Sequence, residues 1–307
     1  MRDMSPLFVI ADTIAIALAE RRPVVALETT LVTHGLPHPQ GVEAALALEA
    51  AVREEGATPA TIGVLDGAIR VGLDRTALEL LATSPDSVKL NPGNLAAQVA
   101  SGRPGSTTVA ATMFAAARVG IEVFATGGIG GVHRGSSESG DVSADMIALG
   151  KYPVAVVCAG AKAILDLPKT VEMLETLGVP VLGFGTDEFP AFYRRSSGLK
   201  VDHRCDDLVA LAKAVRAHFT LALGTGIVVA NPIPAEHELD AEVYERALAT
   251  ALADAAAAGS RGRDVTPFLL DRMRTLTEGR SVVSNLALLE HNARVGARLA
   301  VELGRAS

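Results

Sequence analysis

Lys162 stands at the end of an apolar run, where a lysine could act as a nucleophile. The run Val154–Cys158 has the composition of a buried strand, and the small residues Ala159-Gly160-Ala161 that follow would let a substrate approach closely. Apolar surroundings disfavour the ammonium form, so a neutral amine held there can attack a carbonyl carbon. The alternative is an ordinary surface lysine that closes a strand.

Glu28 has a similar position, directly after the apolar run Val24–Leu27. A carboxyl that is partly buried there would have a raised pKa, which suits it to proton transfer near neutral pH. The alternative is a salt-bridged carboxylate at the edge of a sheet.

The segment Asp141-Val142-Ser143-Ala144-Asp145 brings two carboxylates and a hydroxyl together. These are hard oxygen ligands of the kind that Mg²⁺ or Mn²⁺ prefers. If a helix begins here, both carboxylates share one face near its positive end. Simple capping of a helix by Asp141, with a solvated Asp145, remains the alternative.

Two segments are candidates for binding an anion. Four of the five residues in 127–131 are glycines, which lets backbone N–H groups converge on a negative charge beside Arg134. The pattern is neither a Walker A sequence nor a dinucleotide-binding fingerprint, and a flexible loop explains it equally well. Gly105–Val109 is rich in hydroxyls and is predicted to open a helix, another setting for an anion that Lys89 could reach.

Short apolar runs alternate with Ala-rich helical stretches, which is typical of an α/β fold with a sheet covered by helices. The predicted strands are Val24–Leu27, Thr61–Leu65, Ala68–Val71, Val88–Leu90, Val123–Thr126, Val154–Cys158, Val181–Phe184 and Gly226–Ala230. The predicted helices are Gly41–Glu55, Asp74–Leu81, Thr107–Val119, Val171–Leu177, Asp206–Phe219, Ala241–Ala258, Thr266–Thr277 and Val282–Leu303. Several predicted strands end in a loop with Gly or Pro, namely Asp66-Gly67, Asn91-Pro92-Gly93-Asn94, Gly127-Gly128 and Asn231-Pro232. Ligands of open α/β sheets sit in such loops at the carboxyl ends of the strands. The helical patterning after residue 240 predicts that the C-terminal helices flank the rest of the fold, within a single domain that spans residues 1–307.

Composition narrows the class of protein. Of 307 residues, 49% are hydrophobic but only 4% aromatic, so the core has to be made of Ala, Val, Leu and Ile, as in parallel sheets. The net charge of −7 argues against nucleic-acid binding. Cys158 is predicted in the core and Cys205 in a polar loop, without zinc-site spacing. Met1–Ile10 lacks a signal-peptide pattern and no run is long enough to span a membrane, so a cytoplasmic protein is expected.

Taken together, the motifs resemble the pseudouridine-5′-phosphate glycosidase family, also called the indigoidine synthase A-like family. The likeness covers nearly the whole chain in order, and the stretch from Ala125 to Lys162 is its most specific part. The segments that carry it are Ala26–Thr30 with His34-Gly35, Val88–Leu90, Thr107–Val109, Ala125–Arg134, Asp141–Asp145, Val157–Lys162, Val228–Pro234, Thr266–Leu270 and Ser284-Asn285.

The resemblance implies a three-layer α/β/α sandwich and a homotrimer. It implies reversible cleavage of pseudouridine 5′-phosphate to uracil and ribose 5-phosphate, aided by Mn²⁺. Lys162 would be the nucleophile, Glu28 the proton donor and Asp141 the metal ligand. The positions that match the family's substrate-binding or pocket residues are Lys89, Thr108, Val109, Ser143, Ala144, Asp145, His133 and Asn285.

The implied chemistry agrees with the residue types. The bond from C1′ of the ribose to C5 of uracil joins two carbons, so protonation of a leaving heteroatom cannot break it. Attack by Lys162 on C1′ would open the ribose and supply an electron sink, with the phosphate expected against Lys89 and Ser106–Val109. Two alternatives stay open. A different Schiff-base reaction on ribose 5-phosphate would give a lysine adduct without uracil, and a non-catalytic phosphosugar-binding regulator would give no adduct.

Overall fold

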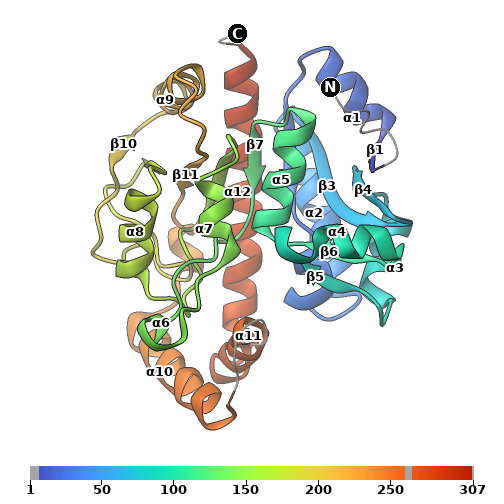
Figure 1. The fold of residues 1–307 in the computed structure, drawn as a ribbon. Coiled ribbons are helices and arrows are strands. Elements are labelled where there is room, and N and C mark those ends of the chain that lie inside the picture. Colours follow the sequence, from blue (N-terminus) through green and yellow to red (C-terminus); the bar gives the residue numbers. More distant parts are fainter. Residues whose placement is uncertain (1–6, 260–264, 306–307) are drawn as a thin grey trace.

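The computed structural model describes residues 7–259 and 265–305 and shows a mixed sheet of eleven strands covered by helices (Figure 1). The strands are β1 Phe8–Ile10, β2 Val24–Leu27, β3 Thr58–Leu65, β4 Ala68–Val71, β5 Val88–Leu90, β6 Gly105–Thr107, β7 Val123–Ala125, β8 Ala155–Cys158, β9 Val181–Phe184, β10 His203–Cys205 and β11 Ile227–Ala230. Their order is β1-β4-β3-β2-β7-β8-β11-β9-β10, and β5 joins through β6 to β3.

The middle of the sheet is parallel. Strands β2, β7, β8 and β11 pair in parallel register, and Leu27, Ala125 and Val157 lie side by side. The carboxyl ends of these strands therefore meet at one edge, where Glu28 follows β2 and Lys162 lies beyond β8. Among the named strands of the described residues, β4 and β6 pair antiparallel, both with the long strand β3.

Strand β3 explains how Lys89 reaches that edge. Its first half, Thr58–Thr61, pairs with β2, while Gly63 and Val64 further along pair with β6. Because Val64 also pairs with β4 on the opposite side, β6 lies along the same edge of β3 as β2 and continues where β2 ends. Strand β5, which carries Lys89, pairs with β6. This brings Lys89 beyond the end of β2.

Helices form a layer on each face of the sheet, which confirms the predicted α/β/α arrangement. The long helix α12 contacts β2, β7 and β8 and is flanked by α2 and α9, whereas α5 packs against the sheet with α7 beside it. The helices are α1 Asp12–Ala19, α2 Gln40–Glu54, α3 Arg75–Thr83, α4 Pro92–Ser101, α5 Val109–Val119, α6 Ser136–Ser139, α7 Ala144–Leu149, α8 Leu167–Thr176, α9 Leu208–Thr220, α10 Ala241–Ala257, α11 Val265–Leu276 and α12 Arg280–Arg305, with short turns η1 Leu31–Gly35 and η2 Ala235–His237. None of the helices in the described ranges is long and apolar enough to cross a membrane.

Small residues set the distance between the layers. Gly296 of α12 lies over the sheet, and a Cβ atom added to it would stand 3.2 Å from Cβ of Ala125. On the opposite face, Ala110, Ala111, Ala115 and Ala116 of α5 are fully buried. The core is thus built from aliphatic side chains and close helix–sheet contact, as the scarcity of aromatic residues predicts.

Several short elements differ from the prediction. Residues 91–94, predicted as a loop, begin α4: Pro92 occupies its first position, and Asn91 and Asn94 form a capping box. The helix predicted from Thr107 begins at Val109 with Thr108 as its N-cap, because Gly105–Thr107 is drawn into the sheet as β6.

The remaining expectations concern the cysteines, the margins of the fold and the domain organisation. Cys205, predicted in a polar loop, is 2% exposed in β10, while Cys158 lies in the core as predicted. Strands β1 and β10 and helix α1 were not predicted. The absence of a leader at Met1–Ile10 falls largely outside the described residues, and the single-domain organisation stays a prediction.

Candidate active site

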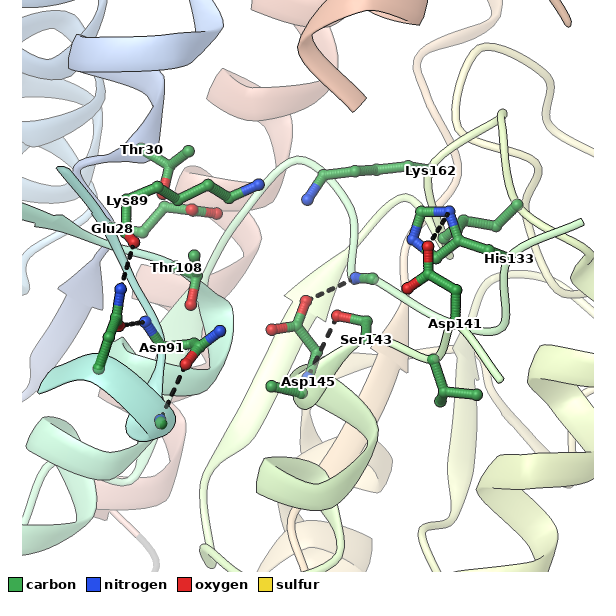
Figure 2. A pocket seen from close by; sticks show the side chains of 16 residues that line it. Glu28, Thr30, Lys89, Asn91, Thr108, His133, Asp141, Ser143, Asp145 and Lys162 are labelled. Atoms are coloured by element: carbon green, nitrogen blue, oxygen red, sulfur yellow. Dashed lines mark hydrogen bonds and ion pairs between the residues drawn. The ribbon is translucent and has the colours of Figure 1, made fainter. Parts of the chain in front are cut away.

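A cavity of about 400 Å³ opens at the carboxyl edge of the parallel strands (Figure 2). It gathers the predicted site residues except Val109 and Asn285. Its lining consists of Glu28, Thr30, Lys89, Asn91, Gly93, Asn94, Thr108, Gly130, His133, Asp141, Val142, Ser143, Ala144, Asp145, Lys162 and Leu165.

The two sides of this cavity come from different parts of the chain. Figure 2 shows Lys89 on one side and Lys162 on the other, with both side chains reaching into the space between them. His133 and Asp141 lie on the side of Lys162, and Asp145 lies at the base. The pocket therefore presents two amine nitrogens, which can attract an anionic ligand.

Glu28 is the titratable group with the clearest adaptation to this site. Burial raises the pKa of its carboxyl, and Asp145 adds to that rise. The charge of Lys162 and a hydrogen bond from the Thr126 hydroxyl to Oε1 oppose it without cancelling it. Glu28 therefore keeps its proton to higher pH than an ordinary glutamic acid, as a proton donor requires.

Lys162 is delivered to the cavity by a short turn after β8. Ala159 and Ala161 are fully buried, and Gly160 has a φ of +77°, a left-handed conformation that favours glycine. The main-chain N–H of Lys162 donates to the carbonyl of Ile129 at 3.0 Å. This bond fixes the start of the side chain while its amine end reaches into the pocket.

The glycine segment binds a carboxyl group of the protein itself, that of Asp145. Asp145 is 4% exposed, and its Oδ2 accepts from the N–H of Gly130 at 2.7 Å. Its Oδ1 accepts from the N–H of Ala110 at 2.9 Å, in the first turn of α5. Arg134 does not line this cavity. This carboxylate links the glycine segment to α7 and α5, and binding of a ligand anion by the segment stays a prediction.

The same segment needs glycines for a steric reason. A Cβ atom at Gly130 would collide with the side chain of Ser143, and one at Gly131 with that of Thr170. At Gly128 it would stand 2.6 Å from the ring of Phe192. These glycines let three other segments close in on the loop, a role that the spacing alone does not reveal.

Asp141 lies before α7 rather than on it. Ser143 caps that helix, and its hydroxyl accepts from the N–H of Asp145 at 3.2 Å. The condition under which Asp141 and Asp145 would share a helical face is therefore not met, and the helix cap is Ser143 rather than Asp141. Oδ2 of Asp141 stands 3.9 Å from Nδ1 of His133, whose pKa is lowered chiefly by burial and held up in part by Asp141.

The donor set at Asp141 suits a cation that is held loosely. Within residues 7–259 and 265–305, no cluster of three His, Cys, Asp or Glu side chains could hold a metal ion. Asp141 would supply one carboxylate, with the His133 ring nearby. Water and ligand oxygens would have to complete the coordination shell, as is common for Mg²⁺ and related hard cations.

A second, smaller compartment of about 80 Å³ adjoins the first and shares Glu28, Thr30, Lys89 and Lys162 with it. Asn285 lines this compartment. Its other walls include the apolar side chains of Leu31, Leu48, Phe192, Leu270 and Leu289. Glu28 and Lys162 therefore stand where a polar and an apolar space meet.

The remaining predicted residue, Val109, is 1% exposed directly after the pocket residue Thr108. Sequence reasoning had not singled out Thr30, Asn91, Asn94, Leu165 or Phe192. The position of Asn91 after β5 was a usable signal, since loops at the carboxyl ends of strands carry ligand sites. For Phe192 the sequence held no such signal, because it lies between elements, away from the motifs.

The fold and the site define a class of α/β protein with a pocket beyond the carboxyl ends of its parallel strands. This pocket brings a lysine and a protonatable carboxyl together in a space suited to a small anion. A family model described as indigoidine synthase A like protein matches residues 13–302. The chain belongs to this family.

Relatives in the family match nearly the whole length of the chain. Proteins from Caldanaerobacter subterraneus subsp. tengcongensis and Paracoccus denitrificans are 52% and 54% identical over 296 and 302 residues. The matches cover 96% of both chains in the first case, and 98% of this chain and 99% of the relative in the second. Both relatives are named pseudouridine-5′-phosphate glycosidase.

Two solved structures share the fold. The prealnumycin C-glycosynthase AlnA, in complex with ribulose 5-phosphate, is 39% identical with a TM-score of 0.90 over 98% of both chains. An indigoidine synthase A-like protein from Thermotoga maritima is 36% identical with a TM-score of 0.88 over 97% of both chains.

Proposed function

We propose that this chain is a pseudouridine-5′-phosphate glycosidase, which reversibly cleaves its substrate to uracil and ribose 5-phosphate. Relatives with that name are about half identical over nearly the full chain, which supports an enzyme acting on a C-glycosidic bond. The observation that carries the proposal is the placing of Lys162 and Glu28 where the polar and apolar compartments meet.

The polarity of the two compartments suggests how the substrate lies. The ribose 5-phosphate half is charged and suits the larger cavity, beside Lys89 and Thr108. Ser106 and Thr107 do not line this cavity, and their hydroxyls engage Thr33 and the carbonyl of Ile62. The phosphate contact expected from Ser106–Val109 therefore reduces to the neighbourhood of Thr108, which does line it. The planar uracil suits the smaller compartment, where Asn285 can recognise its polar edge.

The first step opens the ribose ring. The amine nitrogen of Lys162 attacks C1′, the bond from C1′ to the ring oxygen breaks, and Glu28 gives its proton to that oxygen. The raised pKa of Glu28 keeps the proton available for this transfer. C1′ then carries nitrogen, hydrogen, C2′ and the uracil.

The second step breaks the carbon–carbon bond. The Lys162 nitrogen, positively charged after its attack, first returns a proton to the Glu28 carboxylate. Glu28 then delivers this proton to C5 of uracil, and the freed nitrogen lone pair forms a C1′=N double bond. The electron pair of the C1′–C5 bond returns to the uracil ring, which leaves. Water then hydrolyses the imine, which releases ribose 5-phosphate and restores Lys162, so the net reaction consumes one water.

A divalent cation, which we propose to be Mn²⁺, is expected at Asp141 with His133 beside it. When bound it would supply positive charge to substrate oxygens. Asp145 is engaged by two backbone N–H groups and serves to hold the loop rather than the ion. The homotrimer and the cytoplasmic location remain predictions.

The test is uracil release from pseudouridine 5′-phosphate in the presence of Mn²⁺, with borohydride added in a parallel reaction. We expect uracil from the first and a ribose-phosphate adduct on Lys162 from the second. Since AlnA binds a pentose phosphate, the rival is another Schiff-base reaction on such a compound. An adduct without uracil would favour that rival. The absence of both uracil and an adduct would contradict the proposed function and the rival alike.

A further inference from the structure

A buried pair of asparagines lies at the catalytic edge and has no part in the mechanism above. Asn292, on α12, is 0% exposed, and Asn231, directly after β11, is 2% exposed. Nδ2 of Asn292 donates to the main-chain oxygen of Thr126 at 2.8 Å, and its Oδ1 accepts from Nδ2 of Asn231 at 2.8 Å. The orientation of the Asn292 amide is fixed, because a carbonyl oxygen can only accept.

Packing alone does not call for an amide at this position. Leu288, Val295 and Leu299, on the same helix, are fully buried and apolar, and an aliphatic residue could fill the place of Asn292. A buried amide is unfavourable unless it is hydrogen-bonded, so its bonds have to justify it. Those bonds go to the chain just past the end of β7, where strand pairing runs out.

Thr126 links this pair to the reacting groups. Its N–H donates to the carbonyl of Val157 at 3.0 Å, its carbonyl accepts from Asn292, and its hydroxyl donates to Oε1 of Glu28. Each part of Thr126 is therefore held by a different segment. A shift of its carbonyl would move the hydroxyl that orients the Glu28 carboxyl.

We infer that Asn292, oriented by Asn231, is a positioning residue that holds Thr126 and thereby fixes the direction in which Glu28 presents its proton. The inference rests on the proposed role of Glu28 as proton donor. It also gives a purpose to the Asn231-Pro232 segment, which the mechanism leaves unexplained.

The charges around Glu28 supply a readout that packing would not change. Lys162 after β8, Asp145 on α7 and Lys89 on β5 face the carboxyl, together with the neutral hydroxyl of Thr126. The Thr126 bond lowers the pKa of Glu28. Losing it raises that pKa further, so the alkaline limb of the pH–rate profile, where Glu28 loses its proton, moves to higher pH.

The experiment compares Asn292→Leu with the wild-type full chain. We expect kcat for uracil release to fall about tenfold to a hundredfold, as for a misplaced catalytic group. We expect KM to stay within about twofold, because no substrate contact is removed. The alkaline limb should move to higher pH.

The control for lost packing is Leu299→Ala, on the same face of α12 about two turns further on. It should lower stability and leave the pH profile in place. The second comparison uses Thr126→Val, which lacks the hydroxyl. Adding Asn292→Leu to that variant should lower kcat little further, because both changes act on the same hydrogen bond between Thr126 and Glu28. If Asn292→Leu does not fold, Asn231→Ala, which frees the amide to rotate, takes its place.

The inference would be overturned if the alkaline limb of the pH–rate profile did not move in Asn292→Leu, or if Asn292→Leu lowered kcat equally in the wild-type and Thr126→Val backgrounds. Uracil release by the wild type would still uphold the proposed function in that case. If the wild type released no uracil, the pKa of the Glu28 carboxyl, measured from its infrared band, would decide. It should rise in Asn292→Leu whatever the reaction, and an unchanged value would reject the positioning role.

Discussion

The two compartments that meet at Glu28 and Lys162 differ in how their walls are made. The larger one is lined by loops and helix starts whose polar groups are held by hydrogen bonds, as with the capping box of Asn91 or the two N–H groups on Asp145. The smaller one has apolar walls that include leucines from η1, α2, α11 and α12, and the ring of Phe192 from a loop. A substrate with a charged half and a planar half can be held by such a pair, and the reacting bond then lies at their boundary.

Lys162→Ala removes a group common to both compartments and should have the largest effect. We expect kcat to fall about 10⁴-fold or more, as for loss of a covalent nucleophile. Some phosphate-dependent binding of ribose 5-phosphate should persist, and the melting temperature should change little. Lys169→Ala, an exposed lysine on α8, is the matched control and should keep full activity. Uracil release and borohydride trapping measure the result, and a trapped adduct in Lys162→Ala would contradict the assignment.

Glu28→Gln removes the shared proton donor. We expect kcat to fall about 10³-fold, since general acid catalysis contributes on this scale. In the wild type, activity should decline as pH rises through the raised pKa of Glu28, and this limb should vanish in the variant. Burial raises that pKa, so the free energy of unfolding should also fall as pH rises through it, and less so in Glu28→Gln. Denaturant titrations across pH test this, and identical curves would oppose it.

Lys89→Ala tests the anion-binding side. We expect the affinity for ribose 5-phosphate to fall about a hundredfold, because a charge-assisted hydrogen bond is lost. Affinity for unphosphorylated ribose should be nearly unchanged. Calorimetric titration of both compounds gives the comparison. Equal weakening for the two would mean that Lys89 does not bind the phosphate.

Leu289→Asn tests the apolar side. A polar group without a partner in this wall should raise KM for uracil in the synthetic direction about tenfold. KM for ribose 5-phosphate should stay the same, because that half lies in the other compartment. A parallel rise in both constants would show that the compartments do not divide the substrate as proposed.

Removal of divalent cations should have the smallest structural effect. Chelation is expected to lower kcat several-fold or more and to leave the melting temperature unchanged, because Asp141 supplies a single carboxylate to a loosely held ion. Activity should return with Mn²⁺. Unfolding on chelation would mean that the cation is structural.

The sequence predicted the parallel middle of the sheet well and its margins poorly. Apolar runs such as Val24–Leu27 mark buried strands whatever surrounds them. The three-residue strands β6 and β10 exist only because neighbours pair with them, so Gly105–Thr107 looked like the opening of a helix and Cys205 like part of a loop. In the same way, Asn91-Pro92-Gly93 reads as a turn until its caps are seen to start a helix.

The site shows the same division. Lys162 and Glu28 were predictable because each ends a strand, and parallel strands bring such residues together. The roles of Asp145 and of the glycine segment were not, because they depend on which backbone N–H groups face the carboxylate in three dimensions. Asn292 was missed since a polar residue within a long helix gives no sign that it faces the sheet.

The position of α12 has a consequence for how the chain acquires its site during synthesis. Asn292 contacts Thr126 across 166 residues of sequence, and Arg294 contacts Glu54 across 240. The strands that carry Glu28 and Lys162 thus leave the ribosome long before the helix that covers one face of them. Such distant contacts slow folding, because a long loop has to close before they form. Nascent chains arrested before residue 280 should therefore expose the apolar face of the sheet and depend on chaperones until the last helix docks.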